Sequence, residues 1–232
     1  MEETKPTVTD KDSEVDIESV KWAESTVKHL LGLKQDEAEL AYDDIANSYD
    51  QILKCLSYKA DEETTNVILQ TVPDRNGMIL EVGCGTGVVG EMMYTKGYRN
   101  VYGLDISAEC LKLASKKGVY RETIKANFDG TCHLDFTDGY FDALYSVGCF
   151  APGHLKGDSL PEMIRLTKSG GHIIITLREN VFEQEIGGMD LKSALVESEN
   201  SGVVVRKCHQ KVLYIKVENE EVQGLTLVYR VV

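Results

Sequence analysis

The sequence predicts an α/β fold in which helices cover a doubly wound, mostly parallel sheet of seven strands. Short apolar runs alternate with amphipathic segments between residues 78 and 177, which is typical of a parallel sheet with helices on both faces. A glycine-rich turn follows the first of these runs. The last two runs, 212–217 and 225–231, are separated only by the polar segment 218–223. A connection this short suits a hairpin, so we expect the sheet to end in an antiparallel strand pair.

The chain before residue 75 is expected to be helical and acidic. Apolar residues recur at helical spacing over 17–31, 36–58 and 61–71. Residues 1–63 carry 7 basic and 17 acidic side chains, a net of −10, whereas residues 64–232 carry 18 and 21, a net of −3. We therefore expect three parts, namely an acidic tail and helix at 1–35, a helical cap or lid at 36–74, and the α/β core at 75–232.

The elements of the core follow from the apolar pattern after Asn76-Gly77. We expect strands at 78–82, 101–105, 123–126, 141–147 and 172–177, and helices at 88–96, 108–117 and 159–168. Residues 181–200 are expected to form an irregular or helical insertion before the final strand pair. Right-handed crossovers between parallel strands make a doubly wound sheet the simplest topology.

Composition argues against several classes of function. No run of 18 apolar residues occurs, so we expect no membrane-spanning helix. The acidic start of the chain resembles no targeting signal, which predicts a cytoplasmic protein with a nuclear location as the alternative. Basic residues form no cluster larger than a pair, so nucleic acid is disfavoured as a partner. The six cysteines have no C-x-x-C spacing, and we expect reduced thiols and no metal site.

The string Glu81-Val82-Gly83-Cys84-Gly85-Thr86-Gly87 follows the first strand. Glycines at such a turn let the backbone approach a ligand closely, and the following helix offers unpaired N–H groups. Asp105 lies at the end of the second strand, where a carboxylate can accept hydrogen bonds from two neighbouring ribose hydroxyls. The loop and the acid together predict a site for a nucleoside cofactor.

Other cofactor classes fit this loop less well. No Lys-Ser or Lys-Thr follows the glycines, so a P-loop is excluded. The overlapping string 85–90 fits G-x-G-x-x-G, but Gly90 should then lie inside the helix, and no basic residue flanks the loop to meet a pyrophosphate. An NAD(P)-dependent oxidoreductase stays open as an alternative. A purely structural glycine turn would leave Asp105 unexplained.

The G-x-G-x-G register, with Glu81 two residues before it, resembles motif I of the class I S-adenosylmethionine (SAM)-dependent methyltransferases. Residues 104–107 resemble motif II, residues 138–144 resemble motif IV, and residues 166–172 resemble the turn before strand five. Within motif IV, Asp142 is expected to hold the start of the strand. Upstream, residues 42–50 resemble the Y-D-x-x-A-x-x-Y-D helix of many small methyltransferases, and the combination is similar to the methyltransferase-like protein 27 (Williams–Beuren syndrome region) group.

This resemblance implies a Rossmann-like fold, SAM as the cofactor and S-adenosylhomocysteine (SAH) as the product. It implies direct in-line methyl transfer to a small-molecule acceptor, with a protein acceptor as the alternative. A non-catalytic SAM-binding module also stays open. The expected cofactor-binding residues are Tyr49, Glu81, Gly83, Cys84, Gly85, Thr86, Gly87, Asp105, Ile106, Asn127, Phe128 and Val147.

Roles within this set follow from the resemblance. Asp105 would hold the ribose hydroxyls, and Ile106 would pack on the adenine. Asn127 stands where the family usually has an acid that accepts from the adenine amino group, and a solvent-exposed turn residue is the alternative. Glu81 would set the loop and the ammonium environment. Tyr49, rather than Tyr42, would close over the methionine end, with core packing as the alternative for both tyrosines.

His154, in the loop after the fourth strand, is the candidate general base. It follows the carboxyl end of the sheet, where ligands bind in such folds, and its unperturbed pKa suits proton removal. A solvated loop histidine is the alternative. No Asn/Asp-Pro-Pro-Tyr/Phe string follows this strand, which departs from the methyltransferases that act on adenine or glutamine amides.

Overall fold

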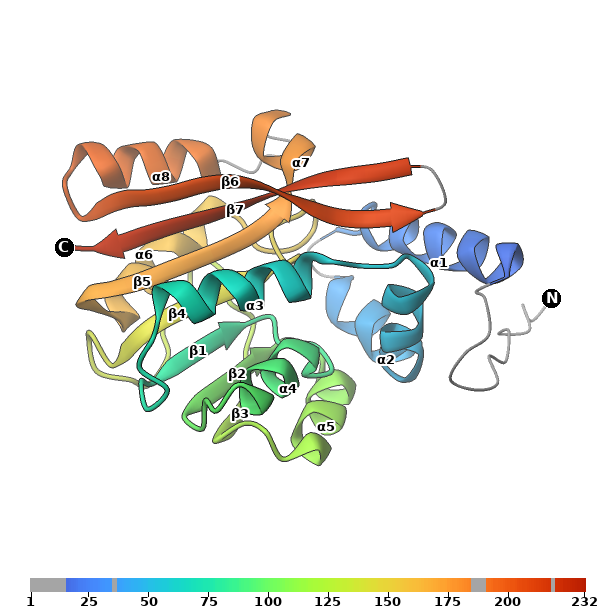
Figure 1. Cartoon of the computed structure of the whole chain (residues 1–232), viewed down its shortest axis with the longest axis horizontal. Helices are drawn as coiled ribbons and strands as arrows, with labels where there is room; N and C mark the ends of the chain where they lie inside the picture. The colour runs from blue at the N-terminus through green and yellow to red at the C-terminus, as the bar shows by residue number, and fades with distance from the viewer. Residues whose placement is uncertain (1–15, 35–36, 185–190, 218–219) are drawn as a thin grey trace.

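In the computed structural model, the described strands form one sheet (Figure 1). The structure describes residues 16–34, 37–184, 191–217 and 220–232. The strands are β1 (Ile79–Val82), β2 (Val101–Asp105), β3 (Glu122–Lys125), β4 (Phe141–Val147), β5 (Thr167–Arg178), β6 (Val204–Val217) and β7 (Glu220–Val231). Their order is β3-β2-β1-β4-β5-β7-β6, parallel from β3 to β5 and antiparallel beyond β5. This confirms the predicted seven-stranded, mostly parallel sheet with an antiparallel C-terminal pair.

Helices cover both faces of the sheet. They are α1 (Ile17–Leu30), α2 (Ala38–Cys55), α3 (Ala60–Thr71), α4 (Val88–Thr95), α5 (Ala108–Lys117), α6 (Leu160–Leu166), α7 (Glu179–Gln184) and α8 (Leu191–Asn200), with a short 3₁₀ turn, η1 (Gly157–Ser159), before α6. Side chains alternate between two cores along each strand, as the strand period of two requires. On β1, Ile79 belongs to the core shared with α3 and α4, whereas Leu80 and Val82 belong to the core shared with α6, α7 and α8.

The N-terminal helices pack against the C-terminal strands. Ala23 of α1, Ile52 of α2 and Ala60 of α3 share a buried cluster with Tyr214 of β6. The N–H of Lys59 also donates to the carbonyl oxygen of Tyr214 at 2.9 Å. Figure 1 shows α1 and α2 beyond the carboxyl ends of the parallel strands. The predicted N-terminal helical cap is therefore present, and it is held at the edge of the sheet where ligands bind in such folds.

The boundary between α6 and β5 differs from the prediction. The helix expected at 159–168 ends at Leu166, and β5 begins at Thr167 instead of His172. Thr167 pairs with Phe141 across an irregular step in the ladder. A Cβ at Gly171 would lie 2.7 Å from the carbonyl oxygen of Asp142. The glycine expected to form a turn thus lets β5 run close beside β4.

The C-terminal strands are longer than predicted. β6 begins at Val204 rather than at residue 212, and residues 206–211 are largely polar. Because β6 is an edge strand with one face towards solvent, polar residues are compatible with its pairing to β7. The expected insertion is helical where described, as α7 and α8, and residues 185–190 lie outside the described residues.

Asp142 holds the start of β4, as expected. Its Oδ2 accepts from the N–H of Met78 at 2.7 Å, and its Oδ1 accepts from Nζ of Lys168 at 2.6 Å. Among the described residues, no helix is both long and apolar enough to cross a bilayer.

Candidate functional site

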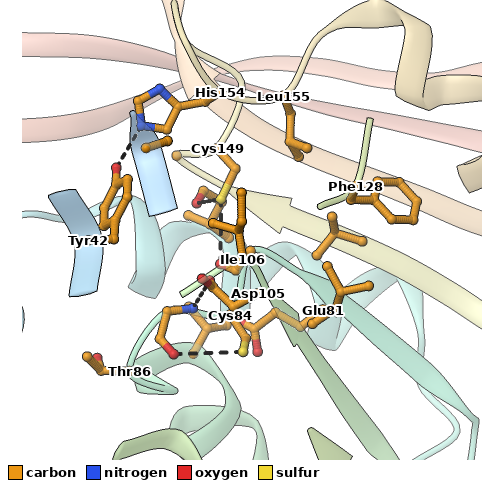
Figure 2. A pocket seen from close by; sticks show the side chains of 18 of the residues that line it. Tyr42, Glu81, Cys84, Thr86, Asp105, Ile106, Phe128, Cys149, His154 and Leu155 are labelled. Carbon is orange, nitrogen blue, oxygen red and sulfur yellow. Dashed lines mark hydrogen bonds between the residues drawn. The ribbon is translucent and has the colours of Figure 1, made fainter. Parts of the chain in front are cut away.

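A pocket lies at the carboxyl ends of β1, β2 and β4, with α2 forming one wall (Figure 2). Its empty volume is about 1100 Å³, counting the part open to solvent. Small-molecule sites usually occupy roughly 300–1000 Å³, so a nucleoside cofactor has enough room. Every residue predicted for the site except Gly87 lines this pocket.

Asp105 ends β2 and fixes the glycine loop. The N–H of Gly85 donates to its Oδ2 at 2.7 Å, and the N–H of Ser107 donates to its Oδ1 at 2.9 Å. Burial raises the pKa of this carboxyl, while these N–H groups oppose the shift. A carboxylate has roughly four lone-pair positions, so Asp105 retains capacity for two hydroxyl donors from a ligand.

Gly83 and Gly85 both have positive φ, of +77° and +52°. A Cβ at Gly83 would lie 2.1 Å from Sγ of Cys149, so the glycine lets the loop after β4 approach the first loop. A Cβ at Gly85 would meet its nearest neighbour, Cε1 of Tyr49, only at 3.7 Å. Gly85 therefore faces open space below Tyr49, as a ligand-binding glycine should.

Gly87 has a different neighbourhood from the one that the motif implies. It begins α4 with a φ of +87° and does not line the pocket. A Cβ there would lie 3.0 Å from Cε2 of Tyr120 and 3.2 Å from Cα of Ala114. The structure thus gives Gly87 a role in the close packing of the start of α4 against Ala114 of α5 and against Tyr120.

Ile106, Asn127 and Phe128 line the pocket near the ends of β2 and β3. Phe128 is also part of the main core. Asn127 is exposed, and its Nδ2 donates to Oδ2 of Asp129 at 2.8 Å. A carboxylate can only accept, so this contact fixes the amide orientation and leaves the amide oxygen to accept from a ligand.

Glu81 lies on β1 and is only 3% exposed. Its Oε2 accepts from the hydroxyls of Tyr120 at 2.6 Å and Tyr145 at 2.7 Å. Burial raises the pKa of Glu81 to about 8, although both hydroxyls oppose the shift. Two internal donors therefore hold this acid beneath the loop.

Tyr42 and His154 meet across the mouth of the pocket, as Figure 2 shows. The Tyr42 hydroxyl lies 2.9 Å from Nε2 of His154, and Nδ1 lies 2.7 Å from the carbonyl oxygen of Pro152. A carbonyl can only accept, so Nδ1 carries the hydrogen and Nε2 accepts from Tyr42. Burial lowers the pKa of His154, which keeps the imidazole neutral. Tyr49 packs edge-to-face on Tyr42 with ring centroids 5.8 Å apart.

Polar contacts tie α2 to the loops beneath it. Asp50 accepts a hydrogen bond from the hydroxyl of Thr86. Asp43 accepts from the hydroxyl of Ser107 at 2.6 Å and from the N–H of Glu109 at 3.1 Å. Thr86, predicted to bind the cofactor, thus spends its hydroxyl on α2. The aspartates of the two Tyr-Asp pairs in the upstream motif, Asp43 and Asp50, therefore attach α2 to the elements beneath it.

The remaining predicted residues lie where their sequence position implies. Val147 ends β4 and lines the pocket. Cys84 is 5% exposed and packs with Leu111 and Ala114, so its small size matters more than its thiol. All six cysteines are free. Among the described residues, no three His, Cys, Asp or Glu side chains are grouped to hold a metal ion.

Several residues that line this pocket were not predicted from the sequence, among them Tyr58, Asp61 and Cys149. Asp61 opens the acidic run 61–63 at the start of α3, which is typical of a solvated first turn. It is instead only 8% exposed. Burial of one acid in that run depends on the packing of α3, and no local pattern reveals it.

Residues 80–175 match a protein family described as a methyltransferase domain. This span runs from β1 into β5 and contains the whole glycine loop and Asp105. This part of the chain is therefore similar to a methyltransferase domain. The resemblance to class I SAM-dependent methyltransferases, first drawn from the loop, is thereby confirmed.

Relatives of this methyltransferase domain include methyltransferase-like protein 27 of Homo sapiens, which is 32% identical over 141 residues, covering 60% of this chain and 57% of that protein. Demethylmenaquinone methyltransferase of Thermobifida fusca is 28% identical over 148 residues, covering 62% of each. Malonyl-[acyl-carrier protein] O-methyltransferase of Hamiltonella defensa is 31% identical over 137 residues, covering 59% and 50%. The chain therefore spans less than two thirds of the length of these curated relatives.

Solved structures share the fold of this chain. A chain of the complex between the Haloferax volcanii Trm112 methyltransferase activator and a methyltransferase matches with TM-score 0.62 and 17% identity, covering 82% of this chain and 95% of that chain. A SAM-dependent methyltransferase of Methanosarcina mazei matches at 0.55 and 16%, covering 72% and 97%. The [4+2]-cyclase SpnF matches at 0.56 and 17%, covering 73% and 80%. The cyclase illustrates that this fold alone does not fix the reaction.

Proposed function

We propose that this protein transfers a methyl group from SAM to a small-molecule acceptor, with a protein acceptor as the alternative. The observation that carries the proposal is the pocket at the sheet edge, where the glycine loop and Asp105 meet. The residues present fit an adenosyl cofactor. Asp105 has capacity for ribose hydroxyls, the amide oxygen of Asn127 can accept from adenine, and Ile106 offers an apolar surface for its ring.

Charge in the pocket favours this cofactor over a dinucleotide. The lining includes Lys156 and the acidic side chains of Asp61, Asp105, Asp129 and Asp158, while Glu81, with a pKa of about 8, is mostly uncharged at pH 7. A field of this sign attracts a sulfonium compound of net positive charge and repels a pyrophosphate. This argues against the NAD(P)-dependent alternative.

The bound cofactor supplies an already activated methyl group, so the protein's tasks are alignment and exclusion of water. Tyr42 and His154 lie on the side of the pocket away from the glycine loop (Figure 2), and Tyr49 packs on Tyr42 above Gly85. His154 is the proposed base for an acceptor that loses a proton. In this scheme the acceptor gives its proton to the hydroxyl of Tyr42, which passes its own proton to Nε2 of His154.

The part of the chain at 36–74 is proposed to act as a lid. Asp43 and Asp50 hold α2 against the side of the pocket, so movement of this lid would break these contacts. Amide exchange over residues 37–60 should slow when SAH is added. Equal protection with and without SAH would reject the lid.

A small-molecule acceptor is supported by the name of one relative, and a group carried on a protein by the name of another. The Thermobifida protein is named for demethylmenaquinone, and the Hamiltonella protein for a malonyl group on a carrier protein. Neither name fixes the acceptor of this chain.

The test combines binding and turnover. Titration calorimetry should show binding of SAH and none of NADH, and incubation with methyl-labelled SAM and a fractionated extract should move label to an acceptor. Binding of NADH in place of SAH would support the oxidoreductase, and SAH binding without label transfer from any fraction would support the non-catalytic module.

A further inference from the structure

Asp61 is a buried carboxylate without an internal partner. It is the second residue of α3, is 8% exposed and lines the pocket. Within the described part of the chain, no donor hydrogen-bonds to its carboxylate and no cation pairs with it. Its backbone carbonyl accepts from the hydroxyl of Thr65 at 2.8 Å, so only the side chain is left without a partner.

The nearest lysines are engaged elsewhere. Lys59 pairs with Glu62 at 3.4 Å, and Lys117 pairs with Asp50 at 3.6 Å and with Glu91 at 3.3 Å. Burial raises the pKa of Asp61 to about 7, and the negative charges of Asp50 and Glu62 add to the shift. A buried, unpaired carboxylate is costly, so its presence in a pocket indicates a ligand group that pairs with it.

The start of α3 does not by itself explain this burial. An acidic side chain is favourable in the first turn of a helix because it faces the positive end of the helix dipole. Glu62 and Glu63 already occupy that turn at the surface or partly exposed. A third acid adds little favourable interaction with the helix dipole, and burying its carboxylate in the pocket costs more free energy than that interaction contributes.

The position of Asp61 selects the end of the ligand that it would meet. Asp105 ends β2, and the strand order places β1 between β2 and β4. Asp61 lines the pocket together with Tyr58 and Cys149. Cys149 lies just beyond the end of β4, and it packs against Gly83, which follows the end of β1. When the ribose of a ligand is held at Asp105, the part of the ligand that extends past the end of β1 therefore reaches Asp61.

Glu81 is the other acid available at that end, but its Oε2 already has two internal donors and burial raises its pKa to about 8, so it is mostly uncharged at pH 7. The hydroxyls of Tyr120 and Tyr145 both donate to it. Asp61 is thus the acid left to pair with a positive charge, and the amino-acid part of an adenosyl cofactor carries an ammonium group.

We propose that Asp61 binds the α-ammonium group of the cofactor's amino-acid part. This inference rests on the proposed function, since it takes an adenosyl amino acid as the ligand. Asp61 is a binding residue in this scheme, and neither Tyr58 nor Cys149 carries a charge that could replace it.

The test compares SAH with 5′-methylthioadenosine, which keeps the adenosine and lacks the amino-acid part. Asp61→Asn keeps the shape of the side chain and removes its charge. It should weaken SAH about ten- to a hundredfold, the range of a lost charged hydrogen bond, and change methylthioadenosine by less than about twofold. Glu63→Gln is the matched control, because it removes a charge from the same helical turn that does not shift the pKa of Asp61, and it should leave both affinities unchanged.

A second measurement separates binding from a structural role. If the carboxylate is unpaired without ligand, ligand-free Asp61→Asn should melt at or above the temperature of the wild type. A lower melting temperature, with both ligands weakened equally, overturns the inference. Unchanged SAH affinity also overturns it and leaves the proposed function standing, whereas wild-type protein that binds neither ligand overturns the proposed function itself.

Discussion

The two ends of the pocket present their carboxylates in opposite ways. At the β2 end, Asp105 accepts from two backbone N–H groups and is part of the structure of the loop. At the α3 end, Asp61 is as deeply buried but has no internal donor among the described residues. Asp105 is therefore positioned before any ligand arrives, whereas the Asp61 carboxylate keeps all its acceptor positions for a ligand.

This difference separates effects on stability from effects on binding. An acid that holds backbone N–H groups contributes to folding and to binding together, because its loss leaves those groups buried without an acceptor. An acid without partners costs stability in the free protein and contributes only when a cation arrives. Variants of Asp105 should therefore change both stability and ligand affinity, whereas variants of Asp61 should weaken ligand affinity without lowering stability.

The largest effect is expected from Asp105→Ala. Two N–H groups lose their acceptor, so the free energy of unfolding should fall by about 2–4 kcal/mol. SAH and methylthioadenosine should both weaken by about a hundredfold or more, since both contain the ribose. Urea unfolding and titration calorimetry measure the two effects, and an unchanged affinity for methylthioadenosine would show that the ribose is held elsewhere.

A smaller effect is expected from pH. The pKa of Asp61 is raised to about 7 in the free protein, and an ammonium group binds its ionised form. Raising the pH from 6 to 8 should therefore strengthen SAH binding by about tenfold. Asp50 and Glu62 raise this pKa, and Lys117 lowers it.

Asp61→Asn is the control for that pH series. Glu81 titrates in the same range, with a pKa of about 8, and this variant retains it. The affinity of Asp61→Asn for SAH should therefore depend less steeply on pH, and the remaining dependence is the contribution of Glu81. An equally steep dependence in the variant would assign the effect to Glu81.

The smallest effect is expected from Tyr42→Phe, at the mouth between the two ends. The change removes the hydroxyl that donates to Nε2 of His154. It should lower the free energy of unfolding by about 1 kcal/mol, or about 2–4 °C in Tm for a chain of this size. Affinity for SAH should stay within about threefold, and a tenfold loss would mean that Tyr42 contacts the ligand. Tyr94→Phe, on the exposed face of α4, is the control.

Much of the β2 end could be predicted from the sequence. The apolar runs of β1 and β2 and the glycine string between β1 and α4 are local patterns, and the parallel topology then brings Asp105 to the loop. The α3 end could not be predicted in this way. In the sequence Asp61 is one of three acids at a helix start, a pattern typical of solvated residues, and its burial comes from packing of α3 against α4 and strands β4, β5 and β6.

Gly87 shows the same limit within the best motif of the chain. The motif predicts a glycine at this position, but the side chains that Gly87 packs against, Tyr120 and Ala114, come from later parts of the chain. The contact between Tyr42 and His154 likewise joins residues 112 positions apart.

The sequence by itself determined the strands, the loop conformation that glycines permit, and the acid at the end of β2, because each depends on residues close together in the chain. Only the tertiary structure decided which acids are satisfied, which glycine faces the pocket and which wall α2 forms. Those properties depend on side chains from separate elements, and their energies arise only when packing removes the water between them.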